Sequence, residues 1–335
     1  MVVLTPDVVK SFKIAKTFAD NNDRINYMDI SASGQYVITS SEDESIQLYD
    51  SEKATLHKTL HSKKYGVDLI SFTRNQNTVI HGSTKIDDTL RQLNLVENRY
   101  IRYFTGHTRK VSSLKMHPKE DVFLSAARDG SVRLWDLRSQ NAQGVIYSPG
   151  RPVASYDPDG MVIAIGYDSA EVKLFDLRTF DKQAPFLVCP VPKIAEGEWT
   201  DLKFNPDTTQ ILVCTSTKSV FVVDAYMGVV QHTLTGFANP KNVPLDASFT
   251  PDGRYILVGA ADGKVHVYES VSGDRLCVLN GDDAHPVSCM RFNPKFMFFA
   301  TAHTKTAFWI PTVTENQEEE SGATTSAHND TKSLF

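Results

Sequence analysis

Short apolar runs, many of them alternating with polar residues, recur along the whole chain and are separated by turn-forming residues. Residues 123–136 hold two such runs around Asp129 and Gly130, and further runs lie at 161–165 and 255–258. Asp-Gly pairs favour tight hairpin turns, and β-rich runs between regularly spaced turns are typical of all-β proteins. The pattern therefore predicts short antiparallel strands throughout.

The runs repeat with a regular period. Each repeat ends on a residue equivalent to Asp136, and these positions are spaced 40 to 48 residues apart: Asp50, Asn94, Asp136, Asp176, Asp224, Glu269 and Ile310. A bulky apolar residue precedes each one: Tyr49, Leu93, Trp135, Phe175, Val223, Tyr268 and Trp309. A period of about 40–45 residues is expected for one four-stranded propeller blade. Seven positions predict seven blades, with the apolar residues packed between neighbouring sheets.

Closure of the ring is predicted from the two ends of the chain. The last repeat supplies three strands, near 287–292, 296–301 and 306–310, before the sequence turns polar. An unassigned run at 11–18 alternates apolar and polar residues. We expect this N-terminal run to be the fourth strand of the seventh blade, because pairing the first and last strands leaves no open sheet edge.

The third repeat carries the most specific motif. Gly106-His107 precedes its first strand, and Trp135-Asp136 ends its third strand. These pairs resemble the WD40 family, whose repeats each form one propeller blade. The resemblance implies a seven-bladed WD40 β-propeller over residues 1–313. Residues 314–335 hold several glutamates and almost no apolar residues, which predicts a disordered acidic tail.

Composition excludes several classes of protein. The 35 Lys and Arg residues face 40 Asp and Glu residues, a net charge of −5, and no Lys/Arg run exceeds two, so we expect no direct nucleic-acid partner. No apolar stretch approaches the length of a membrane span, so no membrane partner is expected. The cysteines form no C-x-x-C pair: Cys189, Cys214, Cys277 and Cys289. Metal-binding and nucleotide-binding motifs are absent, which predicts no cofactor and no metal.

His107, Ser125, Asp129 and Trp135 are expected to form a polar tetrad within the third repeat. Trp135 would donate to Ser125, Ser125 would bond His107, and His107 would bond Asp129. A satisfied buried network of this kind stiffens a fold. The Ser-His-Asp trio also allows a hydrolase interpretation, but no G-x-S-x-G motif surrounds Ser125. The scaffold interpretation is favoured, and no catalytic residue and no enzyme activity are predicted.

Two segments of the second repeat are candidates for partner binding. Residues 62–66 enter this repeat, and residues 98–104 form its last strand. Tyr and Arg are enriched at interface hot spots. The candidate residues are Lys63, Lys64, Tyr65, Arg99, Tyr100, Arg102 and Tyr103. The alternative, that the rings only fill gaps between blades, stays open for Tyr100 and Phe104. Asp87 and Asp88, in a predicted turn, are interpreted as solvated acids.

Further segments closely resemble one branch of WD40 proteins, the WD repeat-containing protein 82 family with the fungal Swd-type subunits of COMPASS. They are residues 62–70, 100–104, 134–139, 198–200, 247–251 and 292–297. The resemblance extends from about Ser11 to Pro311. It implies a nuclear, non-catalytic subunit that binds the SET-domain histone methyltransferase subunit and other COMPASS subunits, which methylate histone H3 on lysine 4.

The same resemblance implies a link to mRNA cleavage and polyadenylation factor, to phosphatase-module subunits and to transcription termination. It also implies a connection, direct or through other subunits, to the RNA polymerase II C-terminal domain and to ubiquitylated histone H2B. A second interpretation rests on Arg138 and Arg178, which follow Trp-Asp and Phe-Asp pairs. This spacing resembles the docking element of substrate receptors in cullin-RING ubiquitin ligases.

Overall fold

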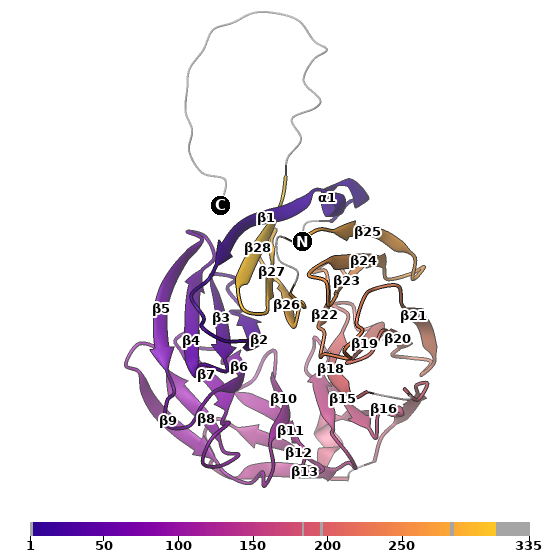
Figure 1. The fold of residues 1–335 in the computed structure, drawn as a ribbon. Coiled ribbons are helices and arrows are strands. Elements are labelled where there is room, and N and C mark those ends of the chain that lie inside the picture. The colour runs from indigo at the N-terminus through magenta and orange to yellow at the C-terminus, as the bar shows by residue number, and fades with distance from the viewer. Residues whose placement is uncertain (1–2, 183, 195–196, 282–284, 313–335) are drawn as a thin grey trace, which may run out of the picture.

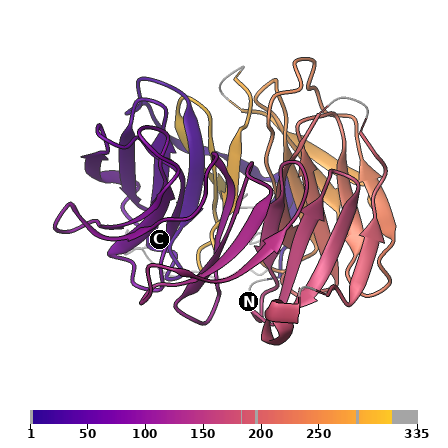
Figure 2. The same cartoon turned by 90° about the horizontal axis from the view of Figure 1, so that it is seen from below.

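The computed structural model describes residues 3–182, 184–194, 197–281 and 285–312. Seven four-stranded antiparallel sheets stand around a central axis (Figure 1). The predicted seven-bladed β-propeller is confirmed. The expected acidic tail, residues 314–335, lies outside the described residues. Figure 2 shows the ring from the side, with the sheets standing next to one another.

Each of the first six blades is built from four consecutive strands. Blade 1 consists of β2 (Ile25–Ile30), β3 (Tyr36–Ser41), β4 (Ser45–Asp50) and β5 (Thr55–His61). Blade 2 consists of β6 (Asp68–Phe72), β7 (Thr78–Gly82), β8 (Leu90–Asn94) and β9 (Arg99–Phe104). Blade 3 consists of β10 (Val111–Met116), β11 (Val122–Ala127), β12 (Ser131–Asp136) and β13 (Ala142–Tyr147).

Blades 4 to 7 continue the ring. Blade 4 consists of β14 (Val153–Tyr156), β15 (Val162–Tyr167), β16 (Glu171–Asp176) and β17 (Leu187–Pro190), with the 3-10 helix η1 (Leu177–Lys182) before β17. Blade 5 consists of β18 (Trp199–Phe204), β19 (Gln210–Thr215), β20 (Val220–Asp224) and β21 (Val230–Leu234). Blade 6 consists of β22 (Ala247–Phe249), β23 (Tyr255–Gly259), β24 (Val265–Glu269) and β25 (Arg275–Leu279). Blade 7 consists of β26 (Cys289–Phe292), β27 (Phe299–Ala302), β28 (Thr306–Pro311) and β1 (Phe12–Phe18).

The repeated apolar positions form the contacts between blades. All seven of the bulky residues predicted for these contacts are at most 3% exposed: Tyr49, Leu93, Trp135, Phe175, Val223, Tyr268 and Trp309. Trp135 and Trp309 stack on a phenylalanine of the preceding strand, with centroids 6.0 and 5.2 Å apart. Fully burying such a side chain contributes about 1.5–3 kcal/mol. The apolar residues that recur once per repeat in the sequence are therefore the ones that are buried between the blades.

The N-terminal strand closes the ring as predicted. Strand β1 pairs antiparallel with β28, and a β-bulge shifts the register between Ile14 and Lys16. Because side chains alternate between the two faces of a strand, this one-residue shift places the two end phenylalanines on opposite faces. Phe12 packs against Phe299 within blade 7, while Phe18 packs against Tyr49 of blade 1. The closing strand thus joins blade 7 to the next blade.

A short helix that the sequence pattern did not reveal precedes this strand. Helix α1 (Pro6–Lys10) is five residues long, and Thr5 caps its first turn. Its buried Val9 and the neighbouring Leu4 pack against blade 6 and blade 7 residues, and the backbone N–H of Leu4 donates to Asp252 of blade 6 at 2.8 Å. One helical turn is too short to produce a helical period in the sequence.

Candidate protein-interaction surfaces

The four residues expected to form a polar tetrad are hydrogen-bonded to one another in blade 3. Trp135 Nε1 donates to Ser125 Oγ at 2.8 Å, and Ser125 Oγ lies 2.7 Å from His107 Nε2. His107 Nδ1 lies 3.0 Å from Asp129 Oδ2. Ser131 Oγ adds a bond of 2.7 Å to the other oxygen of Asp129. The network connects strands β11 and β12, the turn between them and the segment leading into the blade.

The environment of the tetrad explains its charge state. Burial lowers the pKa of His107, which favours the neutral imidazole. Although burial opposes it, hydrogen bonds from Ser131 and His107 lower the pKa of Asp129 and keep its carboxyl ionised. Ser125 is 0% exposed, and its oxygen already bonds two partners, so it cannot reach a substrate in this conformation. The four residues of the tetrad therefore form a structural hydrogen-bond network.

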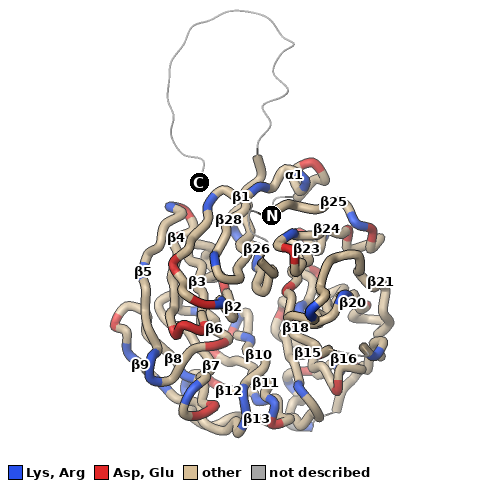
Figure 3. The backbone as a smooth tube through the Cα atoms, in the orientation of Figure 1, with Lys and Arg blue, Asp and Glu red and all other residues tan. Residues whose placement is uncertain are grey.

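On blade 2, three tyrosines surround one arginine and form what we call the blade 2 cluster: Tyr65, Tyr100, Tyr103 and Arg91. The Arg91 guanidinium carbon lies 3.7 Å from the ring centroid of Tyr65 and 5.6 Å from that of Tyr103. Tyr100 contacts both other tyrosine rings, at 5.4 and 6.1 Å. Lys64 Nζ lies 4.9 Å from the Tyr65 ring centroid. Figure 3 shows the basic residues of this region near β9.

Arg91 was not among the predicted residues, yet it organises the cluster. Both oxygens of Asp87 accept hydrogen bonds from it, each at 2.9 Å. The Arg91 side chain is only 3% exposed and that of Asp87 is 42% exposed, and a bidentate pair of this kind fixes the orientation of the guanidinium group. Asp87, interpreted as a solvated acid, is solvent-exposed and also holds Arg91 against the tyrosine rings. The sequence signal that could have found it is the i, i+4 spacing of Asp87 and Arg91.

A β-bulge decides which residues of β9 face the cluster. The register between β8 and β9 shifts so that Arg91 pairs with Tyr103, Gln92 with Arg102, and Leu93 with Tyr100. Tyr100 and Tyr103, three residues apart, therefore share one face of the sheet, and Arg102 lies on the other. Arg102 was predicted to belong to the same partner-binding surface as the tyrosines, but it lies on the opposite face of the sheet from Tyr100 and Tyr103.

The other candidates in blade 2 divide between exposed and packed positions. Lys63 is exposed in the loop before β6, and exposed Arg99 pairs with Glu97 at 3.0 Å. Tyr100 is half-buried, and its hydroxyl lies 2.8 Å from Ser62 Oγ. Phe104 is 1% exposed and packs against blade 3, so it fills a gap between blades. Lys64, Tyr65 and Tyr103 remain accessible together.

Comparison with known proteins assigns the family. The WD40 family, described as WD domain, G-beta repeat, matches residues 12–50, 98–136 and 228–269. WD repeat-containing protein 82 of Drosophila melanogaster is 49% identical over 314 residues, covering 94% of this chain and 99% of that protein. The chain belongs to the WD40 family. This propeller is also 34% identical to the COMPASS component SWD2 of Saccharomyces cerevisiae, over 90% of this chain and 94% of that protein. The Set1 complex component swd2 of Schizosaccharomyces pombe is 29% identical, over 92% of this chain and 99% of that protein.

Arg138 and Arg178 of this WD40 propeller are each held by their own Trp-Asp-type pair. Arg138 forms a two-pronged pair with Asp136, with Nε–Oδ1 and Nη2–Oδ2 distances of 3.0 and 2.7 Å. Arg178 repeats this geometry with Asp176 at 3.0 and 2.6 Å. Both side chains are largely exposed, at 84% and 71%. The internal pairs fix the orientation of both guanidinium groups while leaving them accessible.

The innermost strands of the propeller carry a charge network that was not predicted. Lys115 of β10 lies 2.8 Å from Asp201 of β18, and Arg291 of β26 lies 2.5 Å from Asp246, the residue before β22. Lys203 of β18 lies 2.5 Å from the second oxygen of Asp246. These side chains are 10–17% exposed and face the central axis. The network ties four blades together across the ring.

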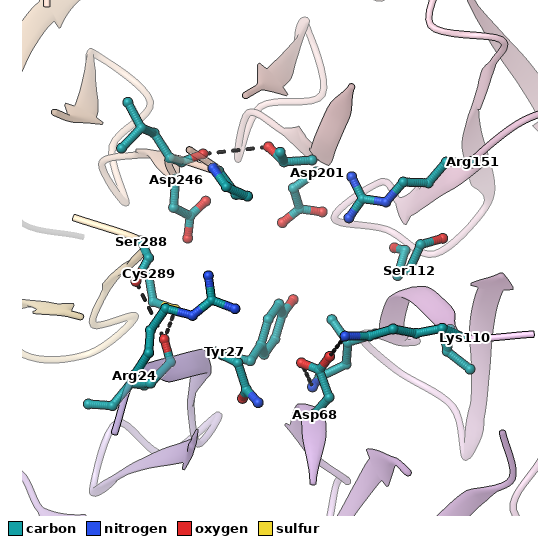
Figure 4. Close-up of a pocket in the computed structure, with 18 of the residues that line it drawn as sticks. Arg24, Tyr27, Asp68, Lys110, Ser112, Arg151, Asp201, Asp246, Ser288 and Cys289 are labelled. Atoms are coloured by element: carbon teal, nitrogen blue, oxygen red, sulfur yellow. Dashed lines mark hydrogen bonds and ion pairs between the residues drawn. The ribbon is translucent and has the colours of Figure 1, made fainter. Parts of the chain in front are cut away.

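A pocket of about 420 Å³ lies at the mouth of the ring where the innermost strands begin. Figure 4 shows Arg24 and Arg151 projecting into it from opposite sides, with Asp201 and Asp246 on its wall. Among the described residues, no three His, Cys, Asp or Glu side chains are grouped as metal ligands. No described helix is long and apolar enough to span a membrane.

Proposed function

We propose that this chain is a non-catalytic scaffold subunit of a COMPASS-type complex that methylates histone H3 on lysine 4 in the nucleus. The observation that carries the proposal is its similarity to proteins named as COMPASS and Set1 complex components, over nine tenths of the chain. The fold is consistent with this role, because a rigid ring with many exposed loops holds several partners in fixed positions. The fully buried hydroxyl of Ser125 offers no nucleophile for catalysis.

Within this proposal, the blade 2 cluster is the docking surface for the SET-domain subunit. Tyr103 is 40% exposed, and Tyr65 and Lys64 lie beside it on the surface. Arg91 and Asp87 fix the rings, so a partner would lose little side-chain entropy on binding. Rigid aromatic anchors next to a cation are the composition expected of an interface hot spot.

The proposal extends to a second assembly, the machinery of mRNA cleavage and polyadenylation with its phosphatase module. Support for this part comes from the resemblance of residues 62–70 and 100–104 to a family that serves both complexes. Contacts to the RNA polymerase II C-terminal domain and to ubiquitylated histone H2B would then pass through these assemblies.

Affinity purification of the tagged chain from nuclear extract, followed by mass spectrometry, tests the function. We expect methyltransferase and cleavage-factor subunits with the wild-type chain. The docking surface is tested with Tyr65→Ala, matched by Tyr147→Ala, which removes another exposed ring, at the end of outer strand β13. Tyr65→Ala should lose the SET-domain subunit, whereas Tyr147→Ala should retain it.

The two outcomes separate the claims. Absence of both complexes from the wild-type purification would reject the proposed function. Equal recovery of the SET-domain subunit with Tyr65→Ala and with Tyr147→Ala would reject only the docking surface on blade 2.

A further inference from the structure

The charged rim of the central pocket is unevenly compensated. Lys110 pairs with Asp68 at 3.0 Å, one cation with one anion. Arg128 and Arg151, by contrast, share one carboxylate, Glu198. Both guanidinium groups approach the same oxygen, Oε2, at 2.8 and 3.6 Å. This part of the rim therefore holds one positive charge more than its own acid neutralises.

The donors of these arginines also exceed the acceptors around them. A guanidinium has five N–H donors and no acceptor. Within the described residues, the Arg128 guanidinium donates only through Nη2, to Glu198, and the Arg151 guanidinium only through Nη1, to the Trp199 carbonyl oxygen at 2.6 Å. Arg151 is only 21% exposed. Burial, together with the charge of Arg128, lowers the pKa of Arg151, which means that the charged guanidinium is destabilised. A bound anion would offset this destabilisation.

The acids in the pocket are already satisfied, which argues against a cationic ligand. Asp246 accepts from Lys203, Arg291 and the backbone N–H groups of Ala247 and Met290. Asp201 is bonded in a similar way, through Lys115 and its own backbone neighbour. A lysine or arginine entering the pocket would find few free lone pairs and would add to the excess of positive charge.

We propose that the central pocket binds one carboxylate of an acidic peptide, a glutamate or aspartate side chain, through Arg128 and Arg151. The paired planar forks of two arginines match the geometry of a carboxylate. The 420 Å³ volume admits a side chain with its flanking backbone. Glu198, which is 48% exposed, is the internal carboxylate that the ligand would displace or join.

The charge of the pocket selects a carboxylate over a phosphate group. The rim has an excess of about one charge, which one carboxylate neutralises. A phosphate monoester carries about −1.5 to −2 charges at neutral pH. Its additional charge would face the carboxylates of Asp68, Asp201 and Asp246, which line the same pocket. This site is separate from the blade 2 cluster and does not depend on which complex contains the protein.

The test uses the full chain and the Nε–Hε signals of its arginines in ¹H–¹⁵N spectra. Three capped five-residue peptides are titrated, each with glycine flanks and a central glutamate, glutamine or phosphoserine. We expect the glutamate peptide to shift the Arg128 and Arg151 signals in a saturable manner, and the glutamine peptide to leave them unchanged. The phosphoserine peptide should bind no more tightly than the glutamate peptide.

Two variants are expected to change the affinity for the glutamate peptide in opposite directions. Glu198→Gln removes the internal competitor and should tighten binding of the glutamate peptide severalfold. Arg151→Gln should weaken it by about tenfold or more, which corresponds to about 1.4 kcal/mol. Arg254→Gln, in the turn after β22 and away from this mouth, is the matched control and should leave binding unchanged.

Three results would overturn the proposal. One is an equal or absent response to the glutamate and glutamine peptides. The second is unchanged or weaker binding by Glu198→Gln, which keeps both arginines and therefore decides the matter even if Arg151→Gln fails to fold. The third is tighter binding of the phosphoserine peptide by about tenfold, which would assign the pocket to phosphate.

Discussion

Replacing Phe18 with alanine measures how much the N-terminal strand stabilises the ring. The side chain is 6% exposed, and its ring lies 4.5 Å from Tyr49 of blade 1 and 5.1 Å from Phe308 of blade 7, centroid to centroid. Truncation removes the buried ring and leaves a cavity between two blades. Phe→Ala changes in cores cost about 3–5 kcal/mol. Because Phe18 is the last residue of β1, where the chain can partly relax, we expect the lower end, about 3 kcal/mol.

The assay is equilibrium urea denaturation followed by tryptophan fluorescence and far-ultraviolet circular dichroism. The matched control is Thr17→Ala, an exposed position on the same strand, which should change the free energy of unfolding by less than about 0.5 kcal/mol. A loss below about 1 kcal/mol for Phe18→Ala, or equal losses for the two variants, would refute the reasoning. Deletion of residues 1–18 should lower the melting temperature sharply, and an unchanged melt would contradict a stabilising role for β1.

Three further predictions concern the polar network, pH and the exposed arginines. His107→Ala should lower the free energy of unfolding by about 1–3 kcal/mol, because it leaves buried partners unpaired; loss of partner binding with unchanged stability in urea would contradict a structural role. Burial lowers the pKa of His81 to about 4, whereas the unfolded chain titrates near 6.5, so the unfolded state takes up the proton first as the pH falls. The stability that His81 contributes is complete above pH 6.5 and is lost between about pH 6.5 and 4, by roughly 3 kcal/mol; His81→Gln should flatten this part of a denaturation series measured against pH, and an unchanged slope would refute the assignment. Arg138→Ala with Arg178→Ala should leave the set of proteins recovered from nuclear extract unchanged, whereas recovery of a cullin adaptor that both substitutions abolish would support the ligase interpretation.

The blade count and the closure could be predicted because they depend on local patterns. Each blade repeats the same short strands and turns, and the bulky residue before each repeat anchor, such as Trp135 or Trp309, recurs at the period of the blade. Such a period can be read from the sequence without knowing which residues are in contact in the folded protein. Closure followed from counting strands, because the last repeat lacked one and residues 11–18 were unassigned.

The composition of the blade 2 cluster was predictable only in part. Interleaved tyrosines and arginines identified Tyr65, Tyr100 and Tyr103, but their sharing of one face depends on the bulge in β9. The same bulge turns Arg102 to the opposite face. A one-residue register shift leaves no clear signal in a single sequence, because each strand still alternates on both sides of it.

The sequence by itself determined the architecture of this protein: seven blades, their order and the strand that closes them. The tertiary structure alone decided which charges meet at the centre. Lys115, Asp201, Asp246 and Arg291 come from four different blades and are paired because the ring brings its innermost strands together. The physical reason is the separation along the chain of the residues that interact. A strand pattern is set by neighbouring residues, whereas each of these ion pairs at the axis joins residues that lie one or more blades apart in the sequence.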